Sequence, residues 1–369
     1  MRDYTNDGLP EMIIFSPGPS NISERVRQAL ALPDICHRDQ EFSDLLREVK
    51  TLLASALKIE GQLYEIVLFS GSGTLAMESL IACFSGWEKS LLVISNGIYG
   101  ERAATIAELY GVNVHELRLD WGVLPQLSAI EEQLRKPHIG GIYLVHHETT
   151  TGLLNPLKEI SLMAKKYNKL VLTDTISSVA GEHLDLNWGI DAALGTANKC
   201  FRGVPGVSFV VLSEELVSIA RNRVRRTFYS DLTMHLDREV NGEMPFTPPV
   251  QPLFAFREAL KEVMEEGVGN RILHYQNISS RLRAGAKDLG LRLFLDEKLY
   301  SNTMTSVHLS QDVTFEELHN KLKERGFIIY NAHGHLRGQL FMLGVVGAIT
   351  MSDIENFLAA LGDVLKEVR

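Results

Sequence analysis

The sequence predicts an α/β protein with a large, mainly parallel mixed sheet flanked by helices and a smaller C-terminal α+β unit. From about residue 40, short aliphatic runs alternate with longer amphipathic stretches, which is typical of repeated β-α-β units. A polar, proline-rich passage at residues 241–252 interrupts this alternation. We therefore expect a large domain over residues 1–250, whose segment near residues 1–20 packs towards the small domain, and a small domain over residues 251–369.

Runs of β-branched and aliphatic residues, most of them bounded by turn or polar residues, predict the strands of the large sheet. These runs cover residues 64–69, 90–94, 141–145, 170–173, 192–195 and 207–212. A helical stretch is expected from residue 254 towards residue 289, followed by strands at 303–309, 327–330 and 339–343. Two capping boxes, Thr314 with Glu317 and Ser352 with Glu355, predict where the helices of the small unit begin.

The composition is that of a soluble globular protein, with 45% hydrophobic and 22% charged residues. The formal charge of -9 argues against nucleic acid as the main partner, because a phosphate backbone requires a basic face. We expect the basic cluster of Arg221, Arg223, Arg225 and Arg226 to be a solvated helix end or a subunit contact. Neither an apolar signal segment nor a membrane-spanning stretch is apparent, so a cytoplasmic protein without a membrane partner is expected.

A glycine-rich segment, residues 71–74, follows the first predicted strand of the large sheet and opens a helix. The backbone N–H groups and dipole at such a helix start attract anions, and Ser72 and Thr74 add hydroxyl groups. The segment also fits a dinucleotide fingerprint, but no acidic residue ends the second strand, and no lysine follows the glycines as in a P-loop. A phosphate-binding cup and a purely structural strand-to-helix turn both remain open.

Two ionisable residues follow later strands of the same predicted sheet. Asp174 comes directly after the strand at 170–173, and Lys199 comes shortly after the strand at 192–195. Because ligands of open parallel sheets bind outside the carboxyl ends of the strands, we expect both side chains to face the same crevice as the glycine-rich turn. A phosphate cup, a carboxylate and an amine together fit pyridoxal phosphate, with Lys199 bound to its aldehyde as a Schiff base and Asp174 paired with its ring nitrogen.

Six segments in the same order resemble the class V aminotransferases of fold type I, and most closely their 2-aminoethylphosphonate:pyruvate transaminase group. These segments cover residues 15–19, 70–74, 96–100, 147–156, 174–178 and 197–206, and the resemblance extends over nearly the whole chain. It implies a homodimeric enzyme that uses pyridoxal 5'-phosphate. It also implies a small-molecule amine and a 2-oxo acid as substrates.

The resemblance also implies roles for individual residues. Ser72, Gly73, Thr74 and Asn198 would lie at the cofactor phosphate, Tyr99 over the ring face and Thr149 beside the ring hydroxyl. Asp174 would pair with the ring nitrogen, and Lys199 would carry the cofactor and move the proton. Thr247 would reach the phosphate of the partner subunit's site, which makes each site composite. Of the adjacent His146 and His147, at most one is expected to face the crevice, and no metal site is expected.

The resemblance fails at one strand near the C-terminus. The family has Phe-Arg-Ile-Gly there, and its arginine binds the acidic group of the substrate; this chain reads Phe341-Met342-Leu343-Gly344. Methionine carries no charge and donates no hydrogen bond. Arg202 or Arg337 is a candidate replacement, and Gly18 and Met342 itself are further candidates for substrate contacts. The glycine- and histidine-rich loop at 331–338 either lines the substrate pocket or forms an exposed turn.

The primary functional hypothesis is therefore a transaminase that moves an amino group from a small amine, such as 2-aminoethylphosphonate, to a 2-oxo acid, such as pyruvate. A pyridoxal-phosphate lyase, or a biosynthetic transaminase with another substrate, is the first alternative because of Met342. A catalytically inert binding protein of the same fold is the second alternative.

Overall fold

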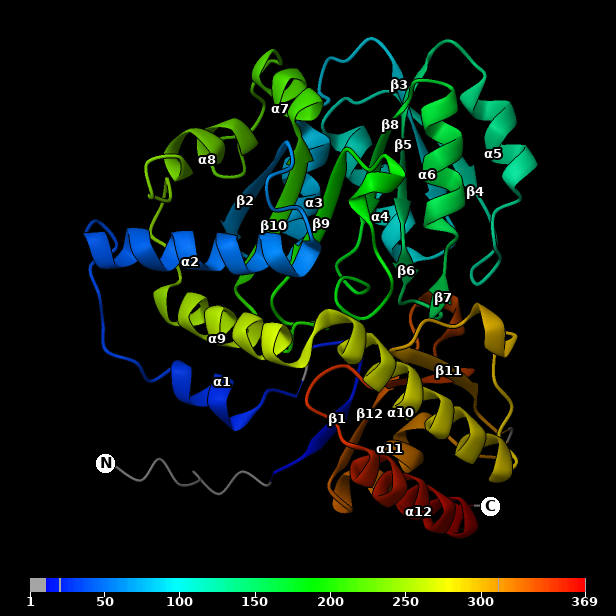
Figure 1. Cartoon of the computed structure of the whole chain (residues 1–369). Coiled ribbons are helices and arrows are strands. Elements are labelled where there is room, and N and C mark those ends of the chain that lie inside the picture. Colours follow the sequence, from blue (N-terminus) through cyan, green and yellow to red (C-terminus); the bar gives the residue numbers. More distant parts are fainter. Residues whose placement is uncertain (1–10, 20, 311, 369) are drawn as a thin grey trace.

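The computed structural model describes residues 11–19, 21–310 and 312–368. Two sheets lie one above the other, with helices around each of them (Figure 1). The described part of the expected N-terminal segment contains β1 (Ile13–Phe15), which joins the smaller sheet beside β12. The rest of that expectation concerns residues 1–10 and 20, which lie outside the described residues. No helix in the described ranges combines the length and apolar character needed to cross a bilayer.

The larger sheet has seven strands in the order β2-β10-β9-β8-β5-β3-β4. Its strands are β2 (Tyr64–Ser70), β3 (Ser90–Ser95), β4 (Val114–Arg118), β5 (Ile139–Val145), β8 (Leu170–Asp174), β9 (Ala192–Thr196) and β10 (Val207–Ser213). All neighbouring pairs are parallel except the two that involve β10. The mixed, mostly parallel sheet of the prediction is confirmed, and so are its six predicted strands. The edge strand β4 was not predicted, because its sequence Val-His-Glu-Leu-Arg is too polar to stand out as a buried strand.

Alternate residues of the central strands face opposite layers of helices. In β2, Ile66 and Leu68 pack into one hydrophobic cluster, while Val67 and Phe69 pack into another. Residues of α2 (Gln40–Leu57), α5 (Leu127–Leu134), α6 (Leu157–Lys166) and α9 (Val250–Glu266) join the first cluster. Residues of α3 (Gly73–Ala82), α4 (Ile98–Leu109), α7 (Glu214–Arg221) and α8 (Leu232–Glu239) join the second. Figure 1 shows α2 and α6 in front of the sheet, α9 below α2, and α3 and α4 behind the sheet.

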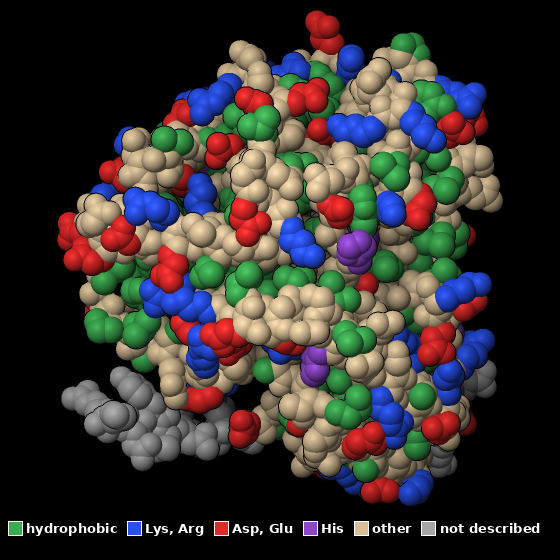
Figure 2. All heavy atoms as spheres, viewed as in Figure 1, with side chains coloured by type: hydrophobic (Ala, Val, Ile, Leu, Met, Phe, Trp, Pro, Cys, Tyr) green, Lys and Arg blue, Asp and Glu red, His purple; other side chains and the backbone are tan. Residues whose placement is uncertain are grey.

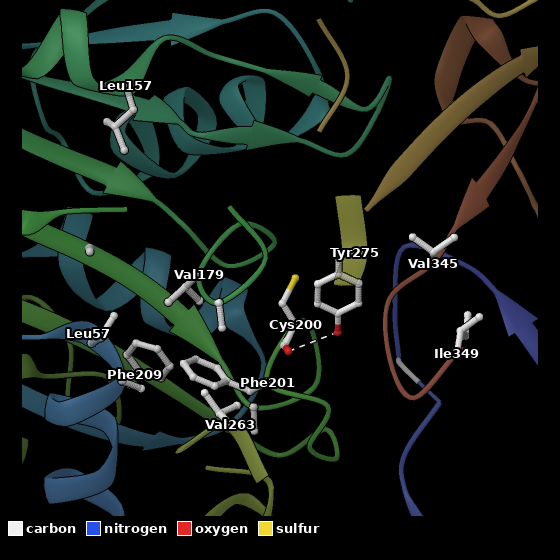
Figure 3. Close-up of a cluster of buried hydrophobic side chains, with 14 of the residues drawn as sticks. Leu57, Leu157, Val179, Cys200, Phe201, Phe209, Val263, Tyr275, Val345 and Ile349 are labelled. Atoms are coloured by element: carbon white, nitrogen blue, oxygen red, sulfur yellow. Dashed lines mark hydrogen bonds between the residues drawn. The ribbon is translucent and has the colours of Figure 1, made fainter. Parts of the chain in front are cut away.

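The smaller sheet has four strands in the order β1-β12-β13-β11. Its other strands are β11 (Met304–His308), β12 (Phe327–Asn331) and β13 (Leu340–Gly344), and its helices are α10 (Val268–Asp288), α11 (Phe315–Glu324) and α12 (Met351–Val368). The cluster on the α2 side of the large sheet continues between the two sheets. Figure 3 shows Phe201 and Phe209 close to Val263, with Tyr275, Val345 and Ile349 on the side of the smaller sheet.

Short elements complete the structure. A two-stranded ribbon pairs β6 (His147–Glu148) with β7 (Leu153–Leu154). The remaining helical turns are α1 (Glu24–Ala29), η1 (Leu186–Trp188), η2 (Glu297–Leu299) and η3 (Gly334–Leu336). On the face shown in Figure 2, basic and acidic side chains are interspersed, and neither sign forms a broad patch there.

Two helix predictions need correction. The single helical stretch from 254 to 289 consists of two helices, because Gly267 between α9 and α10 has a φ of 82°, which an L-residue with a side chain rarely adopts. The capping box predicted at Ser352 lies two residues earlier. Thr350 Oγ1 accepts from Asp353 N at 3.2 Å, while Asp353 Oδ2 accepts from Thr350 N at 2.8 Å. The box at Thr314 and Glu317 is confirmed at the start of α11.

Candidate active site

A cavity of about 370 Å³ lies beyond the carboxyl ends of the parallel strands of the large sheet. Eight of the residues predicted for the cofactor line it: Ser72, Gly73, Thr74, Tyr99, Thr149, Asp174, Asn198 and Lys199. Thr149 follows β6, and the others come from the carboxyl ends of β2, β3, β8 and β9 or from the segments after them, which the common direction of these four strands brings to one edge of the sheet. The predicted crevice is therefore a real cavity with these side chains around it.

The glycine-rich segment forms one wall of the cavity. Ser72 is the N-cap of α3, but its hydroxyl accepts no hydrogen bond from the first turn of that helix. Gly73 begins the helix, and a Cβ atom there would lie 2.5 Å from Cδ1 of Ile176. Gly71 N donates to the carbonyl oxygen of Gly206 at 3.0 Å, which holds the turn against the start of β10. The wall thus offers hydroxyls and first-turn N–H groups to an anion.

Lys199 follows β9, and the N-terminal segment contacts its side chain. Its Nζ donates to the carbonyl oxygen of Pro17 at 2.5 Å. A Cβ atom on Gly18, whose φ is 130°, would lie 2.6 Å from this Nζ, so glycine leaves the space that the amine uses. Burial lowers the pKa of Lys199 to about 8. A substantial fraction of the amine is therefore neutral near pH 8 and able to act as a nucleophile.

Asp174 is the last residue of β8, and its side chain is buried. Its Oδ1 accepts from Ile176 N at 2.8 Å. Burial raises the pKa of Asp174 to about 6, against the opposite effects of the Ile176 N–H, Lys199 and Arg102. A cationic group bound beside this carboxylate would stabilise its charged form.

The start of α4 places Tyr99 in the cavity wall, and the ribbon β6-β7 holds this helix start. Ile98 N donates to Oγ1 of Thr150 at 2.9 Å, and Gly100 N donates to Oε2 of Glu148 at 3.3 Å. Glu148 is fully buried, and burial raises its pKa to about 7. The sequence analysis missed this carboxylate, although a glutamate directly before the first threonines of the 147–156 segment was visible.

His147 lines the cavity, whereas His146 is not among the lining residues. The Nδ1 atom of His147 lies 3.0 Å from the carbonyl oxygen of Ser177, and its Nε2 lies 2.8 Å from Oγ of Ser301. Burial lowers the pKa of His147 to about 4, so the ring is neutral at physiological pH. It therefore links the cavity wall to the segment that leads into β11.

Arg102 also lines the cavity and was missed in the sequence. It lies three residues after Tyr99 on α4, a spacing that puts both side chains on one face of the helix. Its Nη1 donates to Oγ1 of Thr74 at 3.1 Å, and its guanidinium lies 4.7 Å from the ring centroid of Tyr99. The i,i+3 relation to Tyr99 was the available signal.

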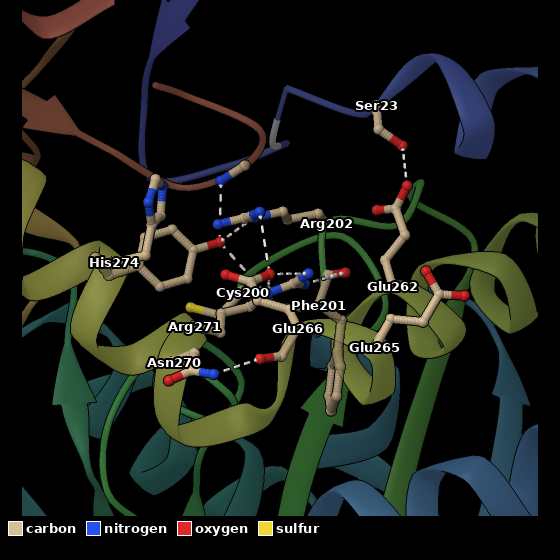
Figure 4. A network of polar contacts seen from close by, with 12 residues as sticks. Ser23, Cys200, Phe201, Arg202, Glu262, Glu265, Glu266, Asn270, Arg271 and His274 are labelled. Atoms are coloured by element: carbon tan, nitrogen blue, oxygen red, sulfur yellow. Dashed lines mark hydrogen bonds and ion pairs between the residues drawn. The ribbon is translucent and has the colours of Figure 1, made fainter. Parts of the chain in front are cut away.

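The other predicted site residues lie outside this cavity lining. Thr247 and Arg337 are exposed. Met342 is buried in a separate apolar cluster with Met304, Ala332, Leu336 and Leu340, against Trp121 and Phe294. Arg202 is directed elsewhere: its Nε donates to the Tyr275 hydroxyl at 3.0 Å, and its Nη1 lies 3.5 Å from Oε2 of Glu266. Figure 4 shows Arg202 within this network beside Glu266 and Arg271.

The loop at 331–338 forms part of a different cavity, of about 690 Å³. Gly334, His335 and Leu336 line it together with Trp121 and Glu101. The ring of His335 lies 4.5 Å from that of Trp121, whose Nε1 donates to Oε1 of Glu101 at 2.9 Å. Ile98 also lines this second cavity, which therefore borders the first turn of α4 as well.

Comparison with known proteins assigns the family. The sequence profile described as Aminotransferase class-V matches residues 21–351. The chain belongs to the class V aminotransferases. This aminotransferase is 35% identical over 363 residues to a protein of Klebsiella pneumoniae named 2-aminoethylphosphonate--pyruvate transaminase, with 96% of the chain and 97% of the relative covered. A protein of the same name from Salmonella schwarzengrund is 34% identical over 359 residues, with 95% and 96% covered.

Solved structures place the aminotransferase among fold-type-I enzymes. An aspartate aminotransferase from Thermus thermophilus superposes with a TM-score of 0.88 at 28% identity, covering 96% of this chain and 99% of the other. Ureidoglycine-glyoxylate aminotransferase from Bacillus subtilis superposes with a TM-score of 0.91 at 27% identity, covering 98% and 94%. The whole described architecture, including both sheets, is thus that of an aminotransferase.

Proposed function

We propose that the protein is a pyridoxal-phosphate-dependent transaminase that moves an amino group from a small amine, such as 2-aminoethylphosphonate, to a 2-oxo acid, such as pyruvate. The observation that carries this proposal is the single cavity lined by the Ser72–Thr74 turn, Asp174 and Lys199. The names of the curated relatives support the choice of donor and acceptor.

The residues present fit pyridoxal phosphate. The cavity volume falls in the range of small-molecule sites. The first N–H groups of α3 lie in the cavity wall, where Gly73 allows Ile176 and Thr196 to pack closely, and Ser72 and Thr74 supply hydroxyls there. A buried carboxylate and a partly buried amine line the same cavity, as a cationic ring nitrogen and an aldehyde require.

When bound, the cofactor supplies an electron sink for the negative charge that develops on the donor carbon. Asp174 would keep the ring nitrogen protonated through its carboxylate. Lys199 would hold the cofactor covalently through Nζ, and its lowered pKa keeps part of the amine neutral for that attack. Once the donor amine displaces it, the same Nζ would take the proton from the donor carbon and return it to the former aldehyde carbon of the cofactor. Tyr99 would cover the ring face, and Thr149 and Asn198 would contact the ring hydroxyl and the phosphate.

A homodimer with composite sites is part of the proposal. Thr247 is exposed, so its side chain is available to a second subunit. The same region presents exposed aromatic surface, because Phe228 is 72% and Tyr229 45% exposed, and both pack against Phe246. Tyr229 donates from its hydroxyl to the carbonyl oxygen of Ser70 at 3.3 Å, which connects this surface to the phosphate-binding turn. A partner covering this surface would also close the turn.

The buried position of Met342 favours a second candidate, a reaction with another substrate. Its strand lies in an apolar cluster with no charged member, so an acidic group is not expected to bind at that strand. A transaminase with another donor, or a lyase, therefore remains the alternative to be tested.

The first experiment tests the cofactor. Purified protein incubated with pyridoxal phosphate should absorb near the edge of the visible range, and borohydride followed by peptide mass spectrometry should locate the cofactor on Lys199. Lys199→Ala should lose both the absorbance and the covalent label. Thr247→Ala, which is expected to affect the partner's site, should keep the covalent label. A parent protein that stays colourless would overturn the proposal.

The second experiment tests the reaction. Pyruvate and 2-aminoethylphosphonate should yield alanine, and neither substrate alone should sustain turnover. Release of ammonia or a carbon fragment without a 2-oxo acid would instead identify a lyase. A panel of other small amines, assayed by alanine formation, decides between 2-aminoethylphosphonate and another donor.

A further inference from the structure

Arg102 is a cation in the cavity wall that forms no ion pair with any described residue. In the described parts of the chain no carboxylate lies within ion-pair distance of its guanidinium, whereas most described arginines have such a partner. Within the described residues its guanidinium donates one hydrogen bond, from Nη1 to the Thr74 hydroxyl, which leaves the other N–H groups of the fork available. A partly buried guanidinium in this state favours binding of an anion.

The contacts of Arg102 direct it to the phosphate-binding turn. Thr74 is the second residue of α3, so its hydroxyl lies beside the first N–H groups of that helix. The guanidinium carbon lies 4.7 Å from the ring centroid of Tyr99, so the same side chain contacts both the phosphate-binding turn and Tyr99. The first turn of α4, held by Glu148 and Thr150, is the rigid base for both side chains.

Charge balance points to the same assignment. A phosphate monoester carries close to two negative charges at neutral pH, and the turn offers only hydroxyls and N–H dipoles. Among the described residues that line the cavity, Arg102 and Lys199 are the cationic side chains, because His147 is neutral. Nζ of Lys199 is committed to the cofactor aldehyde, so it is not free to pair with the phosphate. Arg102 is then the cation left to balance the phosphate.

We infer that Arg102 binds the cofactor phosphate, together with the Ser72–Thr74 turn and Asn198. This assignment rests on the proposed function. Because Arg102 and Tyr99 lie one turn apart on α4, Arg102 would couple the cofactor phosphate to the residue that covers the ring face. A competing assignment of Arg102 is the acidic group of the donor, whose usual arginine is replaced by Met342.

The test compares two ligands that differ only in the phosphate. Apoprotein is titrated with pyridoxal phosphate and with pyridoxal, and binding is followed by absorbance for the parent, Arg102→Gln and Arg102→Lys. A hydrogen bond to a charged group predicts that Arg102→Gln weakens binding of pyridoxal phosphate about tenfold to a hundredfold. Pyridoxal affinity should stay within about twofold of the parent value, and Arg102→Lys should lie between the parent and Arg102→Gln.

The matched control is Arg292→Gln, which removes the charge of an exposed arginine. It should bind both ligands as the parent does. Equal weakening of both ligands in Arg102→Gln would show that the residue only supports the fold, and would overturn the inference. Unchanged cofactor affinity together with a raised KM for acidic donors would also overturn it, because Arg102 would then bind the acidic group of the donor. If the parent itself binds no pyridoxal phosphate, the proposed function fails rather than this inference.

Discussion

Lys199 combines three local features that set its chemistry: a buried position, a carbonyl acceptor at Pro17, and the space left by Gly18. The sequence placed Lys199 after a strand, where a lysine is more often solvated. In the folded protein the N-terminal segment contacts its amine, and burial is the reason that its pKa falls.

The lowered pKa predicts a pH profile for cofactor attachment. In the protein without cofactor, the rate of reaction with pyridoxal phosphate should rise with pH as the amine loses its proton, and level off above about pH 8. Stopped-flow absorbance at a series of pH values measures this rate. A rate that continued to rise towards the ordinary lysine pKa of about 10.4 would contradict the buried environment described here.

At the scale of single elements, helix starts decide where side chains of the site point. Both α3 and α4 begin just after a strand of the large sheet, and the first turn of each helix carries residues that line the cavity. Hydrophobic periodicity predicts such helices well, but it does not show which N-terminal group caps them. The start of α12 illustrates this, because two plausible capping boxes lie two residues apart.

Two substitutions distinguish these capping boxes. Thr350→Ala should lower the free energy of unfolding by about 1 kcal/mol, because the Asp353 N–H loses its acceptor and the helix its N-cap. Ser352→Ala, on the exposed first turn, should change it by less than about 0.5 kcal/mol. Chemical denaturation of both variants measures the difference. The reverse order would restore the box expected from the sequence.

At the scale of the whole molecule, contacts of two buried side chains, His147 in β6 and Glu182 after β8, join the segment before β11 to the part of the chain around the large sheet. Nε2 of His147 lies 2.8 Å from Oγ of Ser301, and Glu182 accepts from the backbone N–H and the side-chain amide of Asn302. These contacts hold the smaller sheet against the part of the molecule that carries the cavity. The division of the chain into domains at residue 250 stays a prediction, which limited proteolysis can test.

The Glu182 contact predicts a pH-dependent contribution to stability. Burial raises the pKa of Glu182 from 4.5 to about 8. At a pH between these values, Glu182 keeps a proton in the folded protein that it has lost in the unfolded chain. Its contribution to the free energy of unfolding is therefore full below pH 4.5 and is lost as pH rises through 8. The difference in unfolding free energy between the parent and Glu182→Gln should therefore fall from pH 5 to pH 9. Denaturation at several pH values tests this, and the exposed Glu159→Gln should show no such trend.

Composite sites predict complementation between two inactive variants. Lys199→Ala lacks the amine, and Thr247→Glu should repel the cofactor phosphate of the partner's site. A hybrid dimer has one site with both defects and one site with none. After subunit exchange of an equal mixture, half of the dimers are hybrids, so about a quarter of the parent transaminase activity should return. Failure of exchanged subunits to regain activity would place Thr247 outside the partner's site.

By itself, the sequence determined the mixed parallel sheet, the family, and the positions of Asp174 and Lys199 at strand ends, because these follow from local periodicity and from residues close together in the chain. The tertiary structure alone decided which cations meet in the cavity. It directs Arg202 to Tyr275 and Glu266 and brings Arg102 beside Thr74, 28 residues away. Burial and partners of a side chain depend on segments distant in sequence, so the spacing of Arg102 to Tyr99 could place it on the same helix face as Tyr99 but could not show that Arg202 points elsewhere.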